Sequence, residues 1–155
     1  MTTIAYDGVT LAADGLCTSG NAIHGRNQEK VFALQVNWGG TKIPAYFAAA
    51  GSIENTWIAR AYLEGEDILS PKRRLSLPES FDGLIVLGDG QCFSVEGTMA
   101  PFPCEYPCSL GSGANFALAA MTMGKSATEA VEVAAQLDVY TGGTIRTYKV
   151  SDLAA

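Results

Sequence analysis

Thr2, directly behind Met1, combines two groups that can do chemistry together. If Met1 is removed, this one residue offers a hydroxyl nucleophile and an α-amine. A free α-amine has a pKa of about 7.7 to 8.0, so a neutral fraction exists near neutral pH and can accept the hydroxyl proton, directly or through a water. Thr2 would then supply both the nucleophile and its general base.

Other common nucleophilic pairs have little support in this chain. His24 is the only histidine, and its neighbours predict a turn rather than the surroundings of a nucleophile. The four cysteines are too irregularly spaced for a disulfide framework, and Cys104 and Cys108 would supply at most half a metal site. We therefore expect buried or partly buried thiols at Cys17, Cys92, Cys104 and Cys108, with no metal and no organic cofactor.

Composition narrows the class of protein. Of 155 residues, 48% are hydrophobic and 17% are charged, which predicts one globular domain over residues 1–155. The net charge of −6 argues against a nucleic-acid partner, and the basic run at residues 72–74 is predicted to be a solvated loop. Apolar stretches fall short of the roughly 18 to 20 residues of a membrane span, and no basic segment precedes an apolar one as in a secretory signal. A cytoplasmic location is expected.

The first half of the chain predicts antiparallel strands followed by a helix. Residues 3–6 and 9–13 flank an Asp7-Gly8 turn and predict a hairpin, and residues 31–34 and 45–50 predict a second strand pair. The stretch between these pairs is expected to be a turn-rich link. Helical spacing behind Ser52 as N-cap predicts a helix over about residues 53–65, and two prolines predict a loop over residues 68–81.

The second half predicts one hairpin, two helices and a closing strand. Two apolar runs around a Gly-Asp-Gly turn predict a hairpin over residues 83–95, and a helix is expected to end at Gly124. Ser126 and Glu129 match a capping box, followed by an apolar face of Ala130, Val133, Ala134 and Leu137. Residues 142–150 predict a strand. This order is typical of an α+β sandwich with helices outside the sheets.

Five ordered segments resemble motifs of the proteasome β-subunit and HslV-like family: TLAADGLCTSGN, NQEKVF, AAAGS, SLGSGANFALAA and DVYTGG. The resemblance covers most of the chain. No single segment is specific, but the five segments in this order are. It implies a four-layer αββα sandwich of the N-terminal nucleophile hydrolase type. Family members carry two helices between AAAGS and the later hairpin, whereas this chain has room for one helix and a Pro-broken loop, so the helical region is shortened.

The resemblance also implies catalytic roles. Thr2 matches the nucleophilic threonine, and Lys30 matches a lysine that favours the alkoxide electrostatically. Asp14 matches the buried aspartate that pairs with this lysine. Gly51 matches the glycine whose backbone N–H donates to the oxyanion.

Three further residues match positions around the threonine amine. Ser112 matches a serine that helps to relay the proton, and Asp138 and Thr141 match residues that orient this serine and the N-terminus. For substrate binding, the resemblance implies that Thr18 bonds an extended peptide as an added strand. It also implies a pocket whose small and apolar walls favour an uncharged side chain, lined by Ala49 and Ile53 with Cys17 and Gln28 nearby.

Each residue also has a structural interpretation. Asp14 before Gly15 could be a turn aspartate, Lys30 could be a surface lysine, and Asp138 could merely end a helix. The segment GSGANF lacks the third glycine of a dinucleotide-binding loop, and no P-loop lysine follows it. Joint occurrence of the residues favours the catalytic interpretation.

The leading hypothesis is a threonine-type peptidase in a self-compartmentalised homo-oligomeric ring that acts on peptides or unfolded proteins. Two alternatives stay open: a non-catalytic shell or scaffold subunit of the same fold, and a small-molecule amidase. The missing helix belongs to a region that the family uses for docking, which leaves an AAA+ unfoldase partner doubtful.

Overall fold

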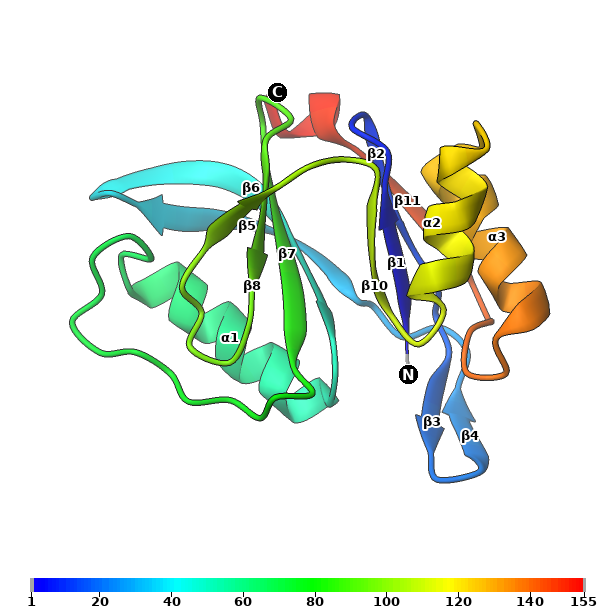
Figure 1. Cartoon of the computed structure of the whole chain (residues 1–155). Coiled ribbons are helices and arrows are strands. Elements are labelled where there is room, and N and C mark those ends of the chain that lie inside the picture. Colours follow the sequence, from blue (N-terminus) through cyan, green and yellow to red (C-terminus); the bar gives the residue numbers. More distant parts are fainter. Residues whose placement is uncertain (1, 155) are drawn as a thin grey trace. The chain divides into compact units, whose positions relative to one another are not determined.

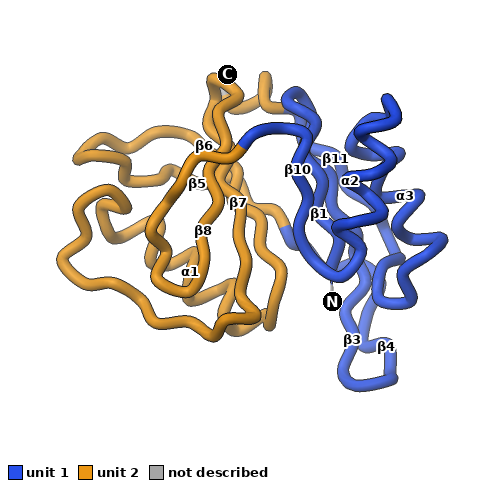
Figure 2. The backbone as a smooth tube through the Cα atoms, viewed as in Figure 1, with its two compact units in different colours: residues 1–30, 105–149 blue, residues 31–104, 150–155 orange. Residues whose placement is uncertain are grey.

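The structure is a computed structural model that describes residues 2–154. The chain divides into two compact units (Figure 2). Unit 1 comprises Met1–Lys30 and Glu105–Lys149, and unit 2 comprises Val31–Cys104 and Val150–Ala155. Each unit combines a β-sheet with at least one helix, which confirms the predicted α+β class. The four-layer sandwich and the single domain over residues 1–155 stay predictions.

Unit 1 is built on an antiparallel sheet in the order β10-β1-β2-β11 (Figure 1). Its strands are β1 (Thr3–Tyr6), β2 (Thr10–Ala13), β10 (Cys108–Gly111) and β11 (Arg146–Lys149). Because β1 lies between β10 and β2, backbone hydrogen bonds hold the first strand of the chain on both sides. Residues that would ordinarily fray are therefore fixed.

Two helices cover one face of this sheet, α2 (Ala114–Thr122) and α3 (Ala127–Leu137) (Figure 1). The core between them is formed mostly by alanines, including Ala5 and Ala12 of the sheet, so the helices pack closely on the strands. The predicted capping box of Ser126 is present at the start of α3.

The predicted apolar face of α3 is wrong at its last residue. Leu137 is 59% exposed, and the inward position one turn after Ala134 is occupied by Asp138. At the C-terminal end of α3 the buried side chain is therefore the carboxylate of Asp138 and not the apolar side chain of Leu137. Asp138 belongs to the part of unit 1 where the candidate site lies.

The stretch predicted to be a turn-rich link contains a short hairpin, β3 (Cys17–Ser19) and β4 (Ala22–Gly25). His24 accordingly lies in a strand and not in a turn. The hairpin is largely exposed and has a register shift between Cys17 and Thr18. A half-buried strand is predicted from a regular alternation of apolar and polar residues, and this exposed hairpin lacks that alternation.

Unit 2 has an antiparallel sheet in the order β5-β6-β7-β8-β9, with α1 (Ile53–Gly65) packed against β5 and β6 (Figure 1). The strands are β5 (Val31–Trp38), β6 (Thr41–Ala50), β7 (Asp82–Leu87), β8 (Cys92–Val95) and β9 (Phe102–Cys104). The first two are longer than predicted and meet at Gly39-Gly40. Residues 66–81 carry no helix, as predicted, and the basic run at residues 72–74 is exposed.

Besides the β3–β4 hairpin, three short elements were not predicted: β9, β10 and the 3-10 helix η1 (Val150–Ala154). Pro101 precedes β9, Pro103 lies within it and Pro107 precedes β10, and proline normally argues against a strand. The closing strand, predicted over residues 142–150, is shorter in the structure: it runs from Arg146 to Lys149, and Val150 begins η1. No helix within residues 2–154 is long and apolar enough to cross a membrane.

Asp7 connects the first hairpin to α3. The loop between β1 and β2 has three residues, one more than predicted, and Asp7 Oδ1 accepts hydrogen bonds from the N–H groups of Val9 and Thr10. Its Oδ2 accepts from the N–H of Ala127, the first residue of α3, at 2.9 Å. One carboxylate thus shapes the turn and caps a helix 120 residues away.

We expect Asp7→Ala to lower the free energy of unfolding by about 1–2 kcal/mol, because it removes a turn acceptor and a helix cap together. Urea denaturation measures the change. The matched control is Asp89→Ala, since Asp89 shapes an exposed turn and caps no helix. Equal losses for the two variants would contradict the capping role of Asp7.

Candidate active site

The carboxylate of Asp14 is the centre of the candidate site in unit 1. Asp14 directly follows β2 and is 2% exposed. Its Oδ1 accepts a hydrogen bond from Lys30 Nζ at 2.7 Å and one from the Thr3 N–H at 3.0 Å. Its Oδ2 accepts from the N–H groups of Leu16 and Gly142 at 3.3 and 3.1 Å. Four donors therefore satisfy this buried charge, which excludes an ordinary turn aspartate.

Lys30 is buried as well, at 8% exposure, and is not a surface lysine. Its ammonium forms an ion pair with Asp14 and donates a second hydrogen bond to the carbonyl of Leu16, both at 2.7 Å. Burial lowers the pKa of Lys30 from its usual value, and the Asp14 carboxylate opposes that shift. Because Nζ and the Thr3 N–H bind the same oxygen, the lysine charge is held next to the start of β1.

Thr2 precedes β1 and is 4% exposed. Ser112 Oγ lies 3.4 Å from the carbonyl oxygen of Thr2. Gly111 lies against the same carbonyl: a Cβ added there would be 1.9 Å from the oxygen of Thr2. Gly111 also has a φ of +94°, which side-chain-bearing residues rarely adopt. A glycine is thus required for the Thr2 backbone to lie where it does.

A chain of hydroxyl groups connects the start of β1 to Asp138. Ser112 Oγ and Thr141 Oγ1 each donate to Asp138 Oδ2 at 2.6 Å. Thr141 Oγ1 is also 2.6 Å from Thr3 Oγ1. Burial acts to raise the pKa of Asp138, but the two hydroxyl donors and the N–H of Tyr140 outweigh it, so the pKa of this carboxyl lies below its usual value. Asp138 is therefore an acceptor that orients Ser112, Thr141 and, through Thr141, Thr3.

Six of the seven predicted catalytic residues thus lie in one connected group of unit 1: Thr2, Asp14, Lys30, Ser112, Asp138 and Thr141. Sequence reasoning missed Thr3, whose N–H binds Asp14 and whose hydroxyl meets Thr141. It also missed Gly113, where a Cβ would be 2.1 Å from Thr3 Oγ1. The only signal for Thr3 was its position beside Thr2. Met1, whose removal the hypothesis requires, lies outside the described residues.

The seventh residue, Gly51, belongs to unit 2. It lies between β6 and α1 with a φ of +139°, and the following Ser52 caps α1 by accepting from the N–H of Asn55. The oxyanion role of Gly51 stays a prediction.

The five predicted substrate-binding residues are divided between the units. Thr18 and Cys17 lie half-buried in β3, and Gln28 follows the β3–β4 hairpin. In unit 2, Ala49 is buried in the core beneath α1, and Ile53 is 43% exposed at the first position of that helix. The pocket that these residues would form stays a prediction.

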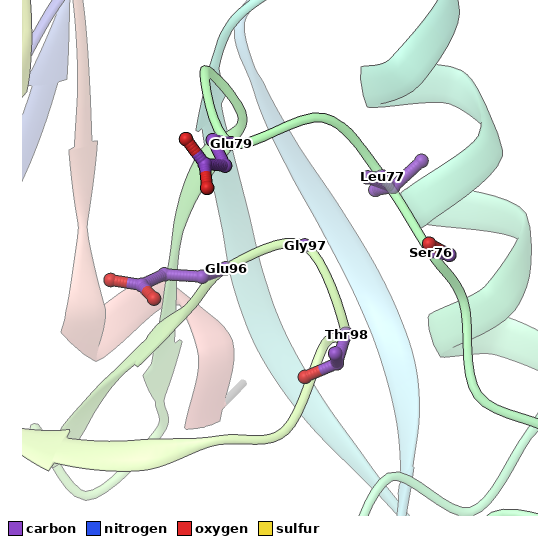
Figure 3. Close-up of a pocket in the computed structure, with 6 residues that line it drawn as sticks. All are labelled: Ser76, Leu77, Glu79, Glu96, Gly97 and Thr98. Atoms are coloured by element: carbon purple, nitrogen blue, oxygen red, sulfur yellow. The ribbon is translucent and has the colours of Figure 1, made fainter.

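A different pocket, of about 480 Å³, lies in unit 2 between residues 76–79 and the segment after β8 (Figure 3). It is lined by Ser76, Leu77, Glu79, Glu96, Gly97 and Thr98. The carboxylates of Glu79 and Glu96 extend toward the same side in Figure 3. Burial, together with the charge of Glu96, raises the pKa of Asp82 nearby. None of the predicted substrate-binding residues lines this acidic pocket.

Comparison with known proteins gives matches at the level of structure. No protein-family model and no curated protein sequence matches the chain. Thiobacillus denitrificans BPH in complex with epoxomicin has a TM-score of 0.69 at 21% identity, over 96% of both chains. A second structure of Thiobacillus denitrificans BPH gives 0.68 at the same identity and coverage. Eukaryotic HslV from Trypanosoma brucei gives 0.60 at 14% identity, over 96% of this chain and 97% of that one.

These identities show the fold alone. The chain has the α+β fold of HslV and BPH over nearly its whole length, so the predicted resemblance is confirmed at the level of fold. The geometry around Thr2, Asp14 and Lys30 is a property of this chain, described from its own contacts.

Gly111→Ala should destabilise the protein strongly, because the new Cβ meets the Thr2 carbonyl in addition to the unfavourable φ. We expect a loss of several kcal/mol in the free energy of unfolding, or no cooperative unfolding at all. Gly124→Ala is the matched control: Gly124 has a φ of +97° and no atom within 4 Å of the added Cβ. Its expected loss is about 1–2 kcal/mol. Similar losses for both would refute the steric argument.

The lowered pKa of Asp138 predicts a pH dependence. A carboxyl whose pKa is lower in the folded than in the unfolded state stabilises the fold above its unfolded value, near pH 4, and loses this contribution as pH falls through the folded value. Asp138→Asn should therefore cost about 1–3 kcal/mol at pH 7 and less below about pH 4. Urea titrations at the two pH values test this, with exposed Asp89→Asn as control. A cost independent of pH would contradict it.

Proposed function

We propose that the chain is a subunit of a threonine-type peptidase whose nucleophile is Thr2, active once Met1 is removed. The observation that carries the proposal is the shared oxygen of Asp14, which binds both Lys30 Nζ and the N–H of Thr3. This bond pair holds a buried positive charge beside the residue that bears the hydroxyl and the amine. The HslV and BPH fold supports a peptidase-type subunit.

In the proposed reaction, the neutral α-amine of Thr2 accepts the hydroxyl proton, directly or through a water. The hydroxyl oxygen attacks the peptide carbonyl, and the Lys30 ammonium stabilises the negative charge that develops. Ser112, fixed by Asp138, helps to relay the proton between the amine and the leaving nitrogen. The N–H of Gly51 donates to the oxyanion of the tetrahedral intermediate.

Collapse of this intermediate breaks the peptide bond, and the leaving amine takes the proton. The product is an ester between the acyl group and Thr2. A water molecule, deprotonated by the same α-amine, then hydrolyses the ester and restores the hydroxyl. The proposed steps use the residues of the chain alone, without metal or organic cofactor.

For substrates we propose peptides or unfolded proteins bound in extended form, with Thr18 of β3 pairing along the backbone. Cys17, Gln28, Ala49 and Ile53 would surround the side chain before the scissile bond. We propose assembly into a homo-oligomeric ring, which would confine the peptidase in a chamber. Neighbouring exposed apolar side chains on α1 support assembly: Trp57 is 52% exposed and Ile58 is 41% exposed.

The proposed setting is the cytoplasm. The stretch over residues 66–81, which lacks a helix, leaves docking of an AAA+ unfoldase doubtful. A non-catalytic shell subunit of the same fold is the main alternative, and a small-molecule amidase is the second. The buried Lys30–Asp14 pair favours catalysis over the shell role, because burying two charges is costly and apolar residues could fill such a core as well.

The test is covalent labelling of the full chain by epoxomicin, the compound bound to BPH in one of the similar structures. Its peptide epoxyketone requires a hydroxyl and a free α-amine on one residue. After intact mass confirms that Met1 is absent, if necessary through treatment with methionine aminopeptidase, we expect one adduct per chain. Thr2→Ala should give no adduct and lower peptide hydrolysis on the order of a thousandfold or more.

Two variants make this test specific. Exposed Thr122→Ala is the control and should label like the wild type. Lys30→Met should lose labelling, and because it leaves the buried Asp14 without its ion partner, circular dichroism and size-exclusion chromatography must first show that the variant is folded and assembled. An adduct on Thr2→Ala, or none on assembled wild type that lacks Met1, would refute the role of Thr2 and favour the shell or amidase alternative.

A further inference from the structure

Two cysteines outside the candidate active site face each other across neighbouring strands of unit 2. Cys92 in β8 and Cys104 in β9 are direct register partners, and their Sγ atoms are 3.1 Å apart. The Cys104 thiol donates to Cys92 Sγ, and the Cys92 thiol donates to the carbonyl of Cys104 at 3.2 Å. As predicted, the four cysteines of the chain are buried or partly buried thiols, so this pair is a reduced dithiol.

The backbone at this pair already satisfies the requirement for a disulfide. Residues directly opposite in antiparallel strands have Cα atoms roughly 4.5 to 5.5 Å apart, which falls within the range of about 4.4 to 6.8 Å found for disulfides. Only the two sulfur atoms must approach each other. The strands themselves can stay in register, with Phe93 opposite Pro103 and Ser94 opposite Phe102.

Accessibility differs between the two thiols. Cys92 is 3% exposed, whereas Cys104 is partly exposed at the end of β9. The sheet order places β9 at the edge of the unit 2 sheet, so a small reagent meets Cys104 first. The buried Cys92 is then in position to react with whatever forms on its neighbour.

We propose that Cys92 and Cys104 form an oxidation site that a peroxide-class oxidant converts into a disulfide. The Cys104 thiolate attacks one peroxide oxygen, the O–O bond breaks, and hydrogen peroxide gives a sulfenic acid and hydroxide. Cys92 then attacks the sulfenic sulfur, forming the S–S bond and expelling the hydroxyl group. The two thiol protons end in water, so two thiols and one peroxide give one disulfide and two waters.

The disulfide would fix an otherwise weakly held part of unit 2. Strand β9 has three residues, and its central Pro103 lacks a backbone donor. The covalent loop from Cys92 to Cys104 contains Glu96, Gly97 and Thr98, which form one wall of the acidic pocket in Figure 3. Oxidation would thus restrict that wall as well as the sheet edge. The proposal is independent of the peptidase mechanism.

The chain offers a direct way to identify the disulfide. Cleavage after glutamate at Glu79, Glu96, Glu105 and Glu129 separates three cysteines into peptides 80–96, 97–105 and 106–129. The full chain is treated with one equivalent of hydrogen peroxide, alkylated under denaturing conditions, cleaved and analysed by mass spectrometry. We expect a cross-link between 80–96 and 97–105, loss of two alkylatable thiols, and an intact mass lower by two hydrogen atoms.

Variants separate this pair from the remaining thiols. Cys104→Ser should keep all of its remaining thiols alkylatable after the same treatment, and Cys17→Ser should form the cross-link like the wild type. Cys92→Ser should trap a sulfenic acid on Cys104 that dimedone labels. A cross-link from 97–105 to 106–129, or four alkylatable thiols in treated wild type, would overturn the proposal. If dimedone labels Cys92 in Cys104→Ser faster than it labels Cys104 in Cys92→Ser, the proposed order of attack is overturned.

Discussion

The buried charge of Asp14 is the interaction on which the rest of unit 1 depends. An isolated carboxylate in an apolar interior is strongly unfavourable, and four hydrogen bonds, one of which is also the ion pair with Lys30, offset this cost in the folded state. The donors come from the start of β1, from residue 16, from Lys30 and from Gly142 near the C-terminal end of unit 1. Satisfying one charge therefore brings separate segments of the chain to one point.

Small residues make this arrangement sterically possible. Alanines at positions 5 and 12 let two helices lie directly on β1 and β2. Gly111 and Gly113 leave room for the backbone of Thr2 and the hydroxyl of Thr3. Ser112 lies between these two glycines at the end of β10, and its hydroxyl is near the Thr2 carbonyl at the start of β1. Residues 111–113 thus both let the start of β1 approach closely and supply a hydroxyl to the candidate site.

Local signals in the sequence predicted much of the fold and most of the candidate site. The capping box at Ser126 and the helix behind Ser52 depend on neighbouring residues and were confirmed. The local patterns of three features were misleading: the hairpin β3–β4 is exposed and lacks apolar alternation, strand β9 contains a proline, and at the end of α3 it is Asp138 that is buried and Leu137 that is exposed. Thr3 shows the same limit at the site: its role comes from Asp14 and Thr141, which the sequence places far from it.

The discontinuity of unit 1 has a consequence for the order of folding during synthesis. Strands β1 and β2 leave the ribosome first, but their partners β10 and β11 follow only after the whole 31–104 segment has been made. Each of the five strands of unit 2 pairs only with the strand before or after it in the chain, so that sheet can form while the chain is still growing. The sheet that contains the first strands of the chain is thus completed late. A nascent chain would expose the apolar surface of β1 and β2 until residues 105–149 emerge.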